Sequence, residues 1–271
     1  NRYEENTSQV YPIRFFVRGD SYKFFGLETD LRLFGVDAPG KVYLMGADRY
    51  GRDIFSRLAY GGRRSLFIGI IGLVVSLSIG MLYGGVSGYF GGWVDNLMMR
   101  FSEIIVSIPS FYLLLALSAV LPPDLPSDQS FMMITFILSF IGWAGLARVI
   151  RGMVLSIAKT EFIAGAEAIG CSQPRIIIRH ILPNTLSYVI VNATLSIPGF
   201  ILSESGLSVI GVGIQHPLAS WGNMLSEALN LSALTRYPWL LIPGFFIFIT
   251  VLSYSFFGDG VRDALDPKAQ T

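Results

Sequence analysis

Residues 161–184 read EFIAGAEAIGCSQPRIIIRHILPN, a polar and basic stretch within an otherwise apolar chain. Uncharged runs precede it at 131–147 and follow it at 181–203. Its first half is rich in alanine and glycine, which suits a short helix that another element approaches closely. Gln173-Pro174 is expected to break that helix, because proline cannot continue the preceding hydrogen-bond ladder. A second short helix, carrying two arginines and a histidine, is expected over 175–181.

Composition places this stretch in a membrane protein. Of 271 residues, 52% are hydrophobic and only 14% are charged, and the mean hydropathy is +0.55. Soluble domains carry about 25% charged residues. The net charge of +1 gives no basic field for nucleic acid. The single cysteine, Cys171, cannot form an internal disulfide.

The apolar stretches predict an all-α polytopic membrane protein with five visible transmembrane helices. Each stretch is long enough, or nearly so, to cross a hydrocarbon core of about 30 Å. The predicted spans cover about 65–88, 104–121, 131–147, 181–203 and 237–257. The intervening segment 148–182, here called the signature loop, carries five lysines and arginines. A tail follows at 259–271.

Small residues and prolines mark where these helices should pack or bend. In the first span, Ser76 and four glycines recur at multiples of four positions: Gly72, Gly80, Gly84 and Gly88. This spacing predicts a helix–helix seam, either with another subunit or within this chain. Prolines predict kinks in the second, fourth and fifth spans, at Pro109, Pro198 and Pro243. Pro183 is expected at the first turn of the fourth span, where proline is tolerated.

Residues 1–64 are mixed polar and aromatic, and they predict an extramembrane segment. Short aromatic and β-branched runs in 11–45 favour a small, partly β cap. Residues 53–64 are expected to form either an interfacial helix or a soluble helix packed on 1–45. The chain begins with Asn1 rather than Met, and five spans with the N-terminus outside predict one further helix, six in all, ahead of the given sequence.

The signature loop resembles that of bacterial ABC importer permeases, whose pattern is EAA, three residues, Gly, nine residues, Ile, one residue, Leu-Pro. Gly170 and Leu182-Pro183 match it, whereas Ala164, Gly165 and His180 replace the family's Glu, Ala and Ile. The sequence RHILPN at 179–184 is similar to the motif of the peptide and nickel branch of this family. Three further stretches resemble that branch: MGADRYGRD at 45–53, LSVIGVGIQHPLASWGNML at 207–225 and DGVRDALDPK at 259–268.

The resemblance implies that the signature loop docks on an ATPase subunit. The residues expected in this coupling contact are Glu161, Ala164, Gly165, Ala166, Glu167, Gly170, Arg175, Arg179, His180 and Pro183. The implied partners are a second homologous permease, two cytoplasmic ATPases, an extracytoplasmic binding protein and the lipid bilayer. The glycine seam and the bent spans are expected to face the second permease. ATP and magnesium are expected in the ATPases and no cofactor in this chain, which lacks a G-x-x-x-x-G-K-[ST] loop.

Charge asymmetry predicts the orientation. Eight lysines and arginines lie in the loops on the side of the signature loop and one, Arg236, lies on the other. The positive-inside rule therefore predicts a multi-pass protein of the bacterial cytoplasmic membrane, with residues 148–182 and the C-terminus in the cytoplasm. Residues 1–64 oppose the rule, but it weakens for segments of about 60 residues or more.

The resulting hypothesis is a permease subunit for di- and oligopeptides. A nickel-chelate or glutathione permease remains open, as does a channel or scaffold subunit without an ATPase. The predicted spans contain no charged residue, which argues against a proton- or sodium-coupled transporter. No nucleophile–base pair or metal-ligand spacing indicates an enzyme or a metal site. The sequence indicates no substrate-binding residues.

Overall fold

The computed structural model describes residues 10–24, 27–37, 40–122 and 124–265. The chain divides into two compact units, Asn1–Phe55 and Ser56–Thr271. In the first unit, β1 (Arg14–Phe24) pairs antiparallel with β2 (Leu27–Gly35), with Arg14 opposite Gly35. The predicted end of the tail, 266–271, and residues 1–9 lie outside the described residues.

Asp48 organises the turn in the MGADRYGRD stretch of the first unit. Its Oδ1 accepts the backbone N–H groups of Tyr50 (2.9 Å) and Arg52 (3.0 Å), while Oδ2 accepts the Arg52 Nε–H at 2.6 Å. Asp48 is 4% exposed. A short buried carboxylate that accepts local backbone donors is the standard way to fix such a turn.

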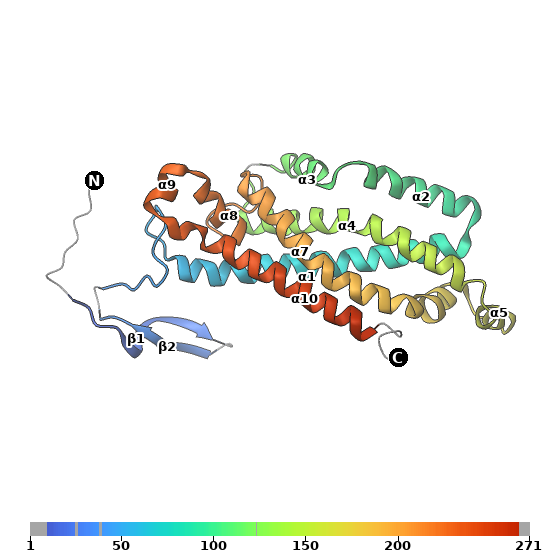
Figure 1. Cartoon of the computed structure of the whole chain (residues 1–271), viewed down its shortest axis with the longest axis horizontal. Coiled ribbons are helices and arrows are strands. Elements are labelled where there is room, and N and C mark those ends of the chain that lie inside the picture. Colours follow the sequence, from blue (N-terminus) through green and yellow to red (C-terminus); the bar gives the residue numbers. More distant parts are fainter. Residues whose placement is uncertain (1–9, 25–26, 38–39, 123, 266–271) are drawn as a thin grey trace. The chain divides into compact units, whose positions relative to one another are not determined.

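The second unit is a bundle of helices. Its elements are α1 (Ile54–Phe90), α2 (Gly92–Ser107), α3 (Ser110–Ala119), α4 (Ser127–Ile157), α5 (Glu161–Ala168), α6 (Gln173–Arg175), α7 (Leu186–Val209), α8 (Trp221–Ser226), α9 (Leu231–Arg236) and α10 (Ile242–Leu265). Figure 1 shows α5 at one end of the bundle and α8 and α9 at the opposite end, here called the α8 end. Among the described residues four helices are long and apolar enough to cross a membrane, or five if α2 and α3 form one bent span.

The first span begins earlier than predicted. Residues 54–64 do not form a separate helix, because α1 runs unbroken from Ile54 to Phe90. Gly61 and Gly62 do not interrupt it. A Cβ on Gly61 would lie 3.2 Å from the Ser220 carbonyl carbon, and one on Gly62 would lie 2.7 Å from the Trp221 ring. Because these two glycines have no side chain, the segment that contains α8 can pack directly against α1.

Pro109 separates two helices instead of kinking one. Residues between the first two predicted spans are largely helical, as α2, and the chain turns by 84° between α2 and α3. Ile108, which precedes the proline, is extended at φ −85° and ψ 125°. The proline ring disfavours helical geometry at the residue before it, so the helix ends there.

The remaining prolines have different roles. Pro198 lies inside α7 and is buried. Pro243 is in the first turn of α10 and so does not bend that helix, contrary to the prediction. The helix continues to Leu265, so the first part of the predicted tail is also helical.

The glycine stripe packs α1 against α4 of the same chain. A Cβ on Gly80 would lie 3.0 Å from the Trp143 carbonyl oxygen, and one on Gly84 would lie 2.5 Å from that of Ala147. Gly88 faces the carbonyl oxygen of Arg151 at 2.8 Å in the same way. Gly72, the first glycine of the stripe, meets α7 instead, because its Cβ would lie 2.8 Å from the Phe200 ring. The expectation that this stripe faces a second subunit is wrong, because α4 and α7 of the same chain already occupy it.

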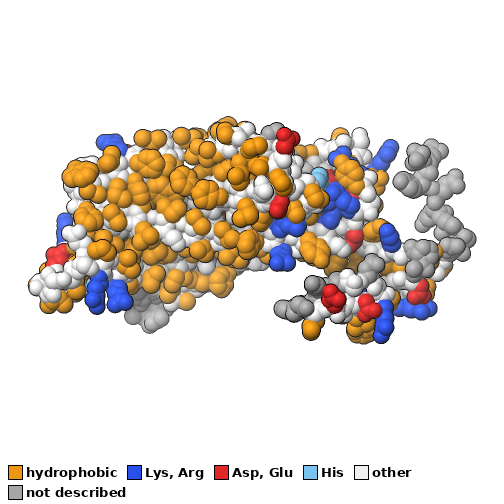
Figure 2. Space-filling model, turned by 180° about the vertical axis from the view of Figure 1, so that it is seen from behind, with side chains coloured by type: hydrophobic (Ala, Val, Ile, Leu, Met, Phe, Trp, Pro, Cys, Tyr) orange, Lys and Arg blue, Asp and Glu red, His pale blue; other side chains and the backbone are white. Residues whose placement is uncertain are grey.

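The surface of the bundle is apolar around its middle. Large side chains stand exposed on several helices, among them Phe67 (50%), Val74 (57%), Phe136 (66%) and Phe248 (58%). Figure 2 shows one face, on which hydrophobic side chains cover the middle and charged ones gather toward the ends. An apolar band bounded by charges is the surface that a lipid bilayer solvates.

We expect Gly84→Ala to destabilise the bundle by about 1–3 kcal/mol, because the added methyl group meets backbone atoms of α4 that cannot rotate away. The midpoint of thermal unfolding in detergent measures the effect. Gly152→Ala is the matched control, since its Cβ meets nothing within 4 Å. That substitution should be neutral or slightly stabilising, because alanine is the better helix former. Equal midpoints for the two variants would contradict the seam.

Candidate functional site

The helix α5 separates a buried face from an exposed face of small residues. Ile163 and Ala166 are 1% and 7% exposed and join a cluster of α4 and α7 side chains that includes Ile150 and Val189. Ala164 and Gly165 face outward, and a Cβ on Gly165 would meet nothing within 4 Å. Phe162 on the same helix is 50% exposed, and beside it Ala164 and Gly165 leave the backbone open to close approach by another protein.

Gly170 ends α5, and Gln173-Pro174 starts the next helix. Gly170 has φ +79°, which glycine adopts without strain. Its N–H donates to the Glu167 carbonyl (2.9 Å) and the Cys171 N–H donates to that of Ala166 (3.1 Å). This is the Schellman arrangement, which satisfies the last carbonyls of a helix. The prediction that Gln173-Pro174 breaks α5 is therefore wrong, because Pro174 occupies the first turn of α6.

Beyond α6 the chain stays helical into α7, so the second loop helix and the fourth span are one helix over Gln173–Val209. The π-helical turn η1 (Ile176–Ile181) and the 3-10 turn η2 (Leu182–Thr185) lie within it. Leu182 N–H donates to the Ile177 carbonyl, five residues back. Pro183 accounts for the wide turn, because its ring would clash with the carbonyl four residues earlier in a regular helix.

The predicted coupling residues separate into two groups. The first group is exposed on α5 and consists of Glu161, Ala164, Gly165 and Glu167. Arg175 and Arg179 are exposed on the following helix and belong to the same group. Among the described residues neither arginine forms an ion pair. Ala166 is buried in the core and Gly170 shapes the turn. His180 is half-buried, and its carbonyl oxygen accepts the Asn184 Nδ2–H at 2.5 Å. Only the first group offers side chains to a partner.

Two polar links, neither assigned a role by the sequence reasoning, tie this end of the bundle together. Tyr89 at the end of α1 donates its hydroxyl to Glu167 Oε1 of α5 at 2.8 Å. Asp95 of α2 accepts the Ser87 hydroxyl at 2.6 Å and the Arg151 Nε–H at 2.9 Å, and so joins α1, α2 and α4. Opposite charges on two neighbouring apolar helices were the available signal for the Asp95–Arg151 pair.

A cavity of about 400 Å³ lies among α1, α3, α4 and α7. Among the residues that the structure describes, no charged side chain lines it. Its polar and glycine lining consists of Ser76, Ser110, Gly142, Gly145, Asn192, Ser196, Gly199 and Ser203, and leucine, isoleucine and phenylalanine side chains complete the wall. The spacing of Asn192, Ser196, Gly199 and Ser203 places them on one face of α7, a signal that the sequence contains and that sequence reasoning missed.

At the α8 end a buried carboxylate connects three segments. Glu204 of α7 is 0% exposed. It accepts hydroxyl hydrogens from Ser208 at 2.6 Å, Ser220 at 2.8 Å and Ser65 at 3.4 Å. The prediction that the spans contain no charged residue is wrong for the observed helix, because α7 extends to Val209 and so includes Glu204.

The segment that contains SWGNM folds back against the bundle. Trp221 Nε1–H donates to the Leu58 carbonyl at 3.0 Å, and its backbone N–H donates to Ser65 Oγ at 3.2 Å. A Cβ on Gly222 would lie 2.6 Å from the Cα of Ser205, so only glycine fits there. This motif is a packing element that closes the α8 end.

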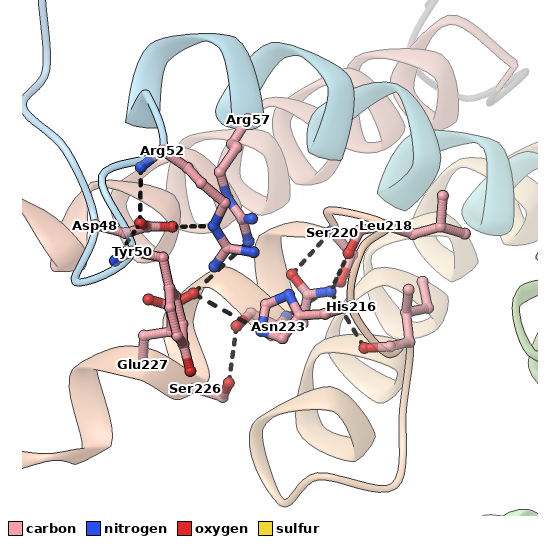
Figure 3. A network of polar contacts seen from close by, with 11 residues as sticks. Asp48, Tyr50, Arg52, Arg57, His216, Leu218, Ser220, Asn223, Ser226 and Glu227 are labelled. Atoms are coloured by element: carbon pink, nitrogen blue, oxygen red, sulfur yellow. Dashed lines mark hydrogen bonds and ion pairs between the residues drawn. The ribbon is translucent and has the colours of Figure 1, made fainter. Parts of the chain in front are cut away.

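Figure 3 shows the polar contacts around α8. Ser220 and Asn223 form a capping box, in which each side chain accepts the backbone N–H of the other at 3.1 Å. Glu227 Oε1 lies 3.7 Å from Arg57 Nη2 and 3.9 Å from His216 Nε2. Among the described residues no group of three or more His, Cys, Asp or Glu side chains could hold a metal ion.

Comparison with known proteins places these features in context. The family model "Binding-protein-dependent transport system inner membrane component" matches residues 68–271. The oligopeptide transport system permease protein OppC of Haemophilus influenzae is 44% identical over 227 residues, which are 83% of this chain and 70% of that protein. OppC of Bacillus subtilis is 42% identical over 231 residues, which are 85% of this chain and 73% of that protein. The dipeptide transport system permease protein DppC of B. subtilis is 40% identical over 231 residues, which are 85% of this chain and 70% of that protein.

Among solved structures, a chain of the MetNI methionine ABC transporter in an inward-facing conformation is similar, with a TM-score of 0.58 and 17% identity. The match covers 79% of this chain and 98% of that chain. At this identity the likeness concerns the fold alone, and it shows that the helices of the two chains follow a shared path.

We expect Tyr89→Phe to loosen α5 locally, because it removes the hydroxyl that Glu167 accepts. A net hydrogen bond contributes about 0.5–1.5 kcal/mol, so amide hydrogen exchange in 161–168 should accelerate by up to about tenfold. Tyr83→Phe is the matched control, since the Tyr83 hydroxyl donates to the Met98 carbonyl of α2 at 2.7 Å. Unchanged exchange in α5 for Tyr89→Phe would contradict the link.

Proposed function

The chain belongs to the family of binding-protein-dependent transport system inner membrane components and is a permease subunit of an ABC importer, and we propose that its substrates are short peptides. The relatives that are 40–44% identical are permeases of oligopeptide and dipeptide transport systems. The observation that carries the proposal is the uncharged, serine- and asparagine-lined cavity among α1, α3, α4 and α7.

The cavity suits the chemical groups that all peptides share. The hydroxyls of Ser76, Ser110, Ser196 and Ser203 and the amide of Asn192 both donate and accept hydrogen bonds. These groups can match backbone N–H and C=O groups of a peptide in either direction. Without a fixed charge the wall selects weakly among substrate side chains. Such a wall suits one half of a passage whose other half a second permease provides.

The exposed face of α5 is proposed to receive an ATPase subunit. No phosphate-binding loop of the G-x-x-x-x-G-K-[ST] type occurs in the sequence, so ATP hydrolysis is assigned to partner chains. Force on α5 reaches the cavity by two routes. Ile163 and Ala166 are embedded in the cluster with α4 and α7, and the helix over 173–209 continues from the signature loop to Asn192 and Ser203 at the cavity wall. Packed cores transmit such displacements because they are nearly incompressible.

The proposed assembly has two ATPases and the signature loop in the cytoplasm, and a second permease and an extracytoplasmic binding protein complete it. Eight lysines and arginines against one across the loops support this orientation. The exposed aromatic side chains of α10, including Phe245, Phe248 and Phe256, provide apolar surface for the second permease or for lipid.

We expect Gly199→Trp to block uptake of a labelled dipeptide by the whole importer in proteoliposomes. A Cβ on Gly199 meets nothing within 4 Å, so the indole enters the cavity without disturbing the bundle. Leu202→Trp is the control, because Leu202 is 50% exposed on the same helix and does not line the cavity. The proposal would be contradicted if the unmodified importer took up a nickel chelate but no peptide. Normal peptide uptake by the Gly199→Trp importer would also contradict it.

We expect Gly165→Trp to uncouple ATP hydrolysis from uptake while the subunit still inserts and folds, because the position is exposed and open. ATPase activity and dipeptide uptake are measured on the same proteoliposomes. Gly260→Trp on α10, also exposed with nothing within 4 Å of its Cβ, serves as the control and should leave both rates unchanged. Coupled uptake at the normal rate in Gly165→Trp would exclude α5 as the docking helix.

A further inference from the structure

We infer that a groove between α2 and α4 binds the phosphate of an anionic phospholipid headgroup through Arg148. The groove has a volume of about 270 Å³. Its lining comes from α2 and α4 only: Asp95, Asn96, Met99, Arg100, Glu103, Arg148 and Arg151. This site is separate from the uncharged cavity and from the exposed face of α5.

The charges of the groove leave one arginine unmatched. Arg151 is committed to Asp95, whose side chain is 8% exposed. Arg100 Nη1 lies 3.1 Å from Glu103 Oε2, so these two residues of α2, three apart in the sequence, neutralise each other. Arg148 is exposed, and no hydrogen bond or ion pair joins its side chain to another residue in the described part of the chain. The groove therefore keeps one net positive charge.

The position of Arg148 favours an anionic ligand. It lies within α4, a helix that meets the criteria for a membrane span, about two and a half turns before the helix ends at Ile157. Near the end of a span the long side chain of an arginine extends to the headgroup boundary, where a phosphate can solvate its charge. The planar guanidinium matches a phosphate with two parallel hydrogen bonds, and the neighbouring Asn96 amide adds a further donor.

The surface beside the groove suits the acyl chains of the same lipid. On α2, Trp93, Leu97, Phe101 and Ile104 are 76%, 65%, 49% and 62% exposed, and they form a stripe next to Asn96, Arg100 and Glu103. A polar groove bordered by exposed apolar side chains and a tryptophan is typical of the headgroup boundary. With the proposed orientation, this boundary faces the cytoplasmic leaflet, where anionic lipids attract basic side chains. The inference rests on the proposed function only for that orientation.

The test measures lipid binding by the purified whole importer, with native mass spectrometry counting bound phosphatidylglycerol and phosphatidylcholine. For Arg148→Gln, the apparent Kd for phosphatidylglycerol should rise about tenfold, the loss expected for one charged hydrogen-bonded contact. Phosphatidylcholine binding should not change. Arg236→Gln is the matched control, since Arg236 is an exposed arginine on α9 with no ion pair found in the described residues. It should bind phosphatidylglycerol as the unmodified importer does.

Three outcomes would overturn the inference. Equal phosphatidylglycerol binding by Arg148→Gln and Arg236→Gln would exclude Arg148 as the ligand. Inorganic phosphate that displaces phosphatidylglycerol at equimolar concentration would indicate a site for free anions. Loss of the second permease from the purified Arg148→Gln importer would indicate an acidic side chain of that subunit as the partner. Dipeptide uptake is recorded in parallel, and its failure in the unmodified importer would count against the proposed function and not against the lipid site.

Discussion

The close approach of α1 to α4 is the constraint on which the rest of the bundle depends. Three glycines, Gly80, Gly84 and Gly88, face carbonyl oxygens spaced four residues apart on α4. The two helices therefore run in the same direction with their backbones in contact, which larger residues would prevent. In a lipid-solvated protein such contacts replace the hydrophobic effect as the force between helices. The α1–α4 pair is the frame against which α2, the signature loop and the SWGNM segment all pack.

This frame gives the two ends of the bundle different properties. At the α5 end, the buried cluster around Ile163 and Ile150 and the Tyr89–Glu167 hydrogen bond fasten a short helix whose outer face stays open. At the α8 end, Glu204 and the serines around it hold α7, α1 and α8 together. One helix, over 173–209, connects the two ends. In the proposed mechanism a displacement at α5 therefore reaches both the cavity and the closed end.

Charge is distributed in a way that fits transport of varied peptides. The cavity has hydroxyls, an amide and glycines but no fixed charge, whereas the charged networks lie at the ends of the bundle. A passage with polar, uncharged walls solvates a peptide backbone without trapping a charged substrate. The unmatched Arg148 lies outside this passage, in the groove between α2 and α4.

The sequence alone determined the class of protein, the approximate spans, the family and the exposed small-residue face at Ala164 and Gly165, because hydrophobic run lengths and a local motif are properties of contiguous residues. Only the tertiary structure decided which partner the glycine stripe packs against, that Gly170 and not Gln173-Pro174 ends α5, and that Pro109 separates two helices. It also brought Ser76, Ser110 and Asn192 to one cavity and placed Glu204 inside α7. The partner of the glycine stripe and the lining of the cavity depend on contacts between residues far apart in the chain, about which local propensity carries no information. The helix ends at Gly170 and Pro109 are local, but the sequence pattern allowed more than one way to end or bend each helix, and the structure selected one.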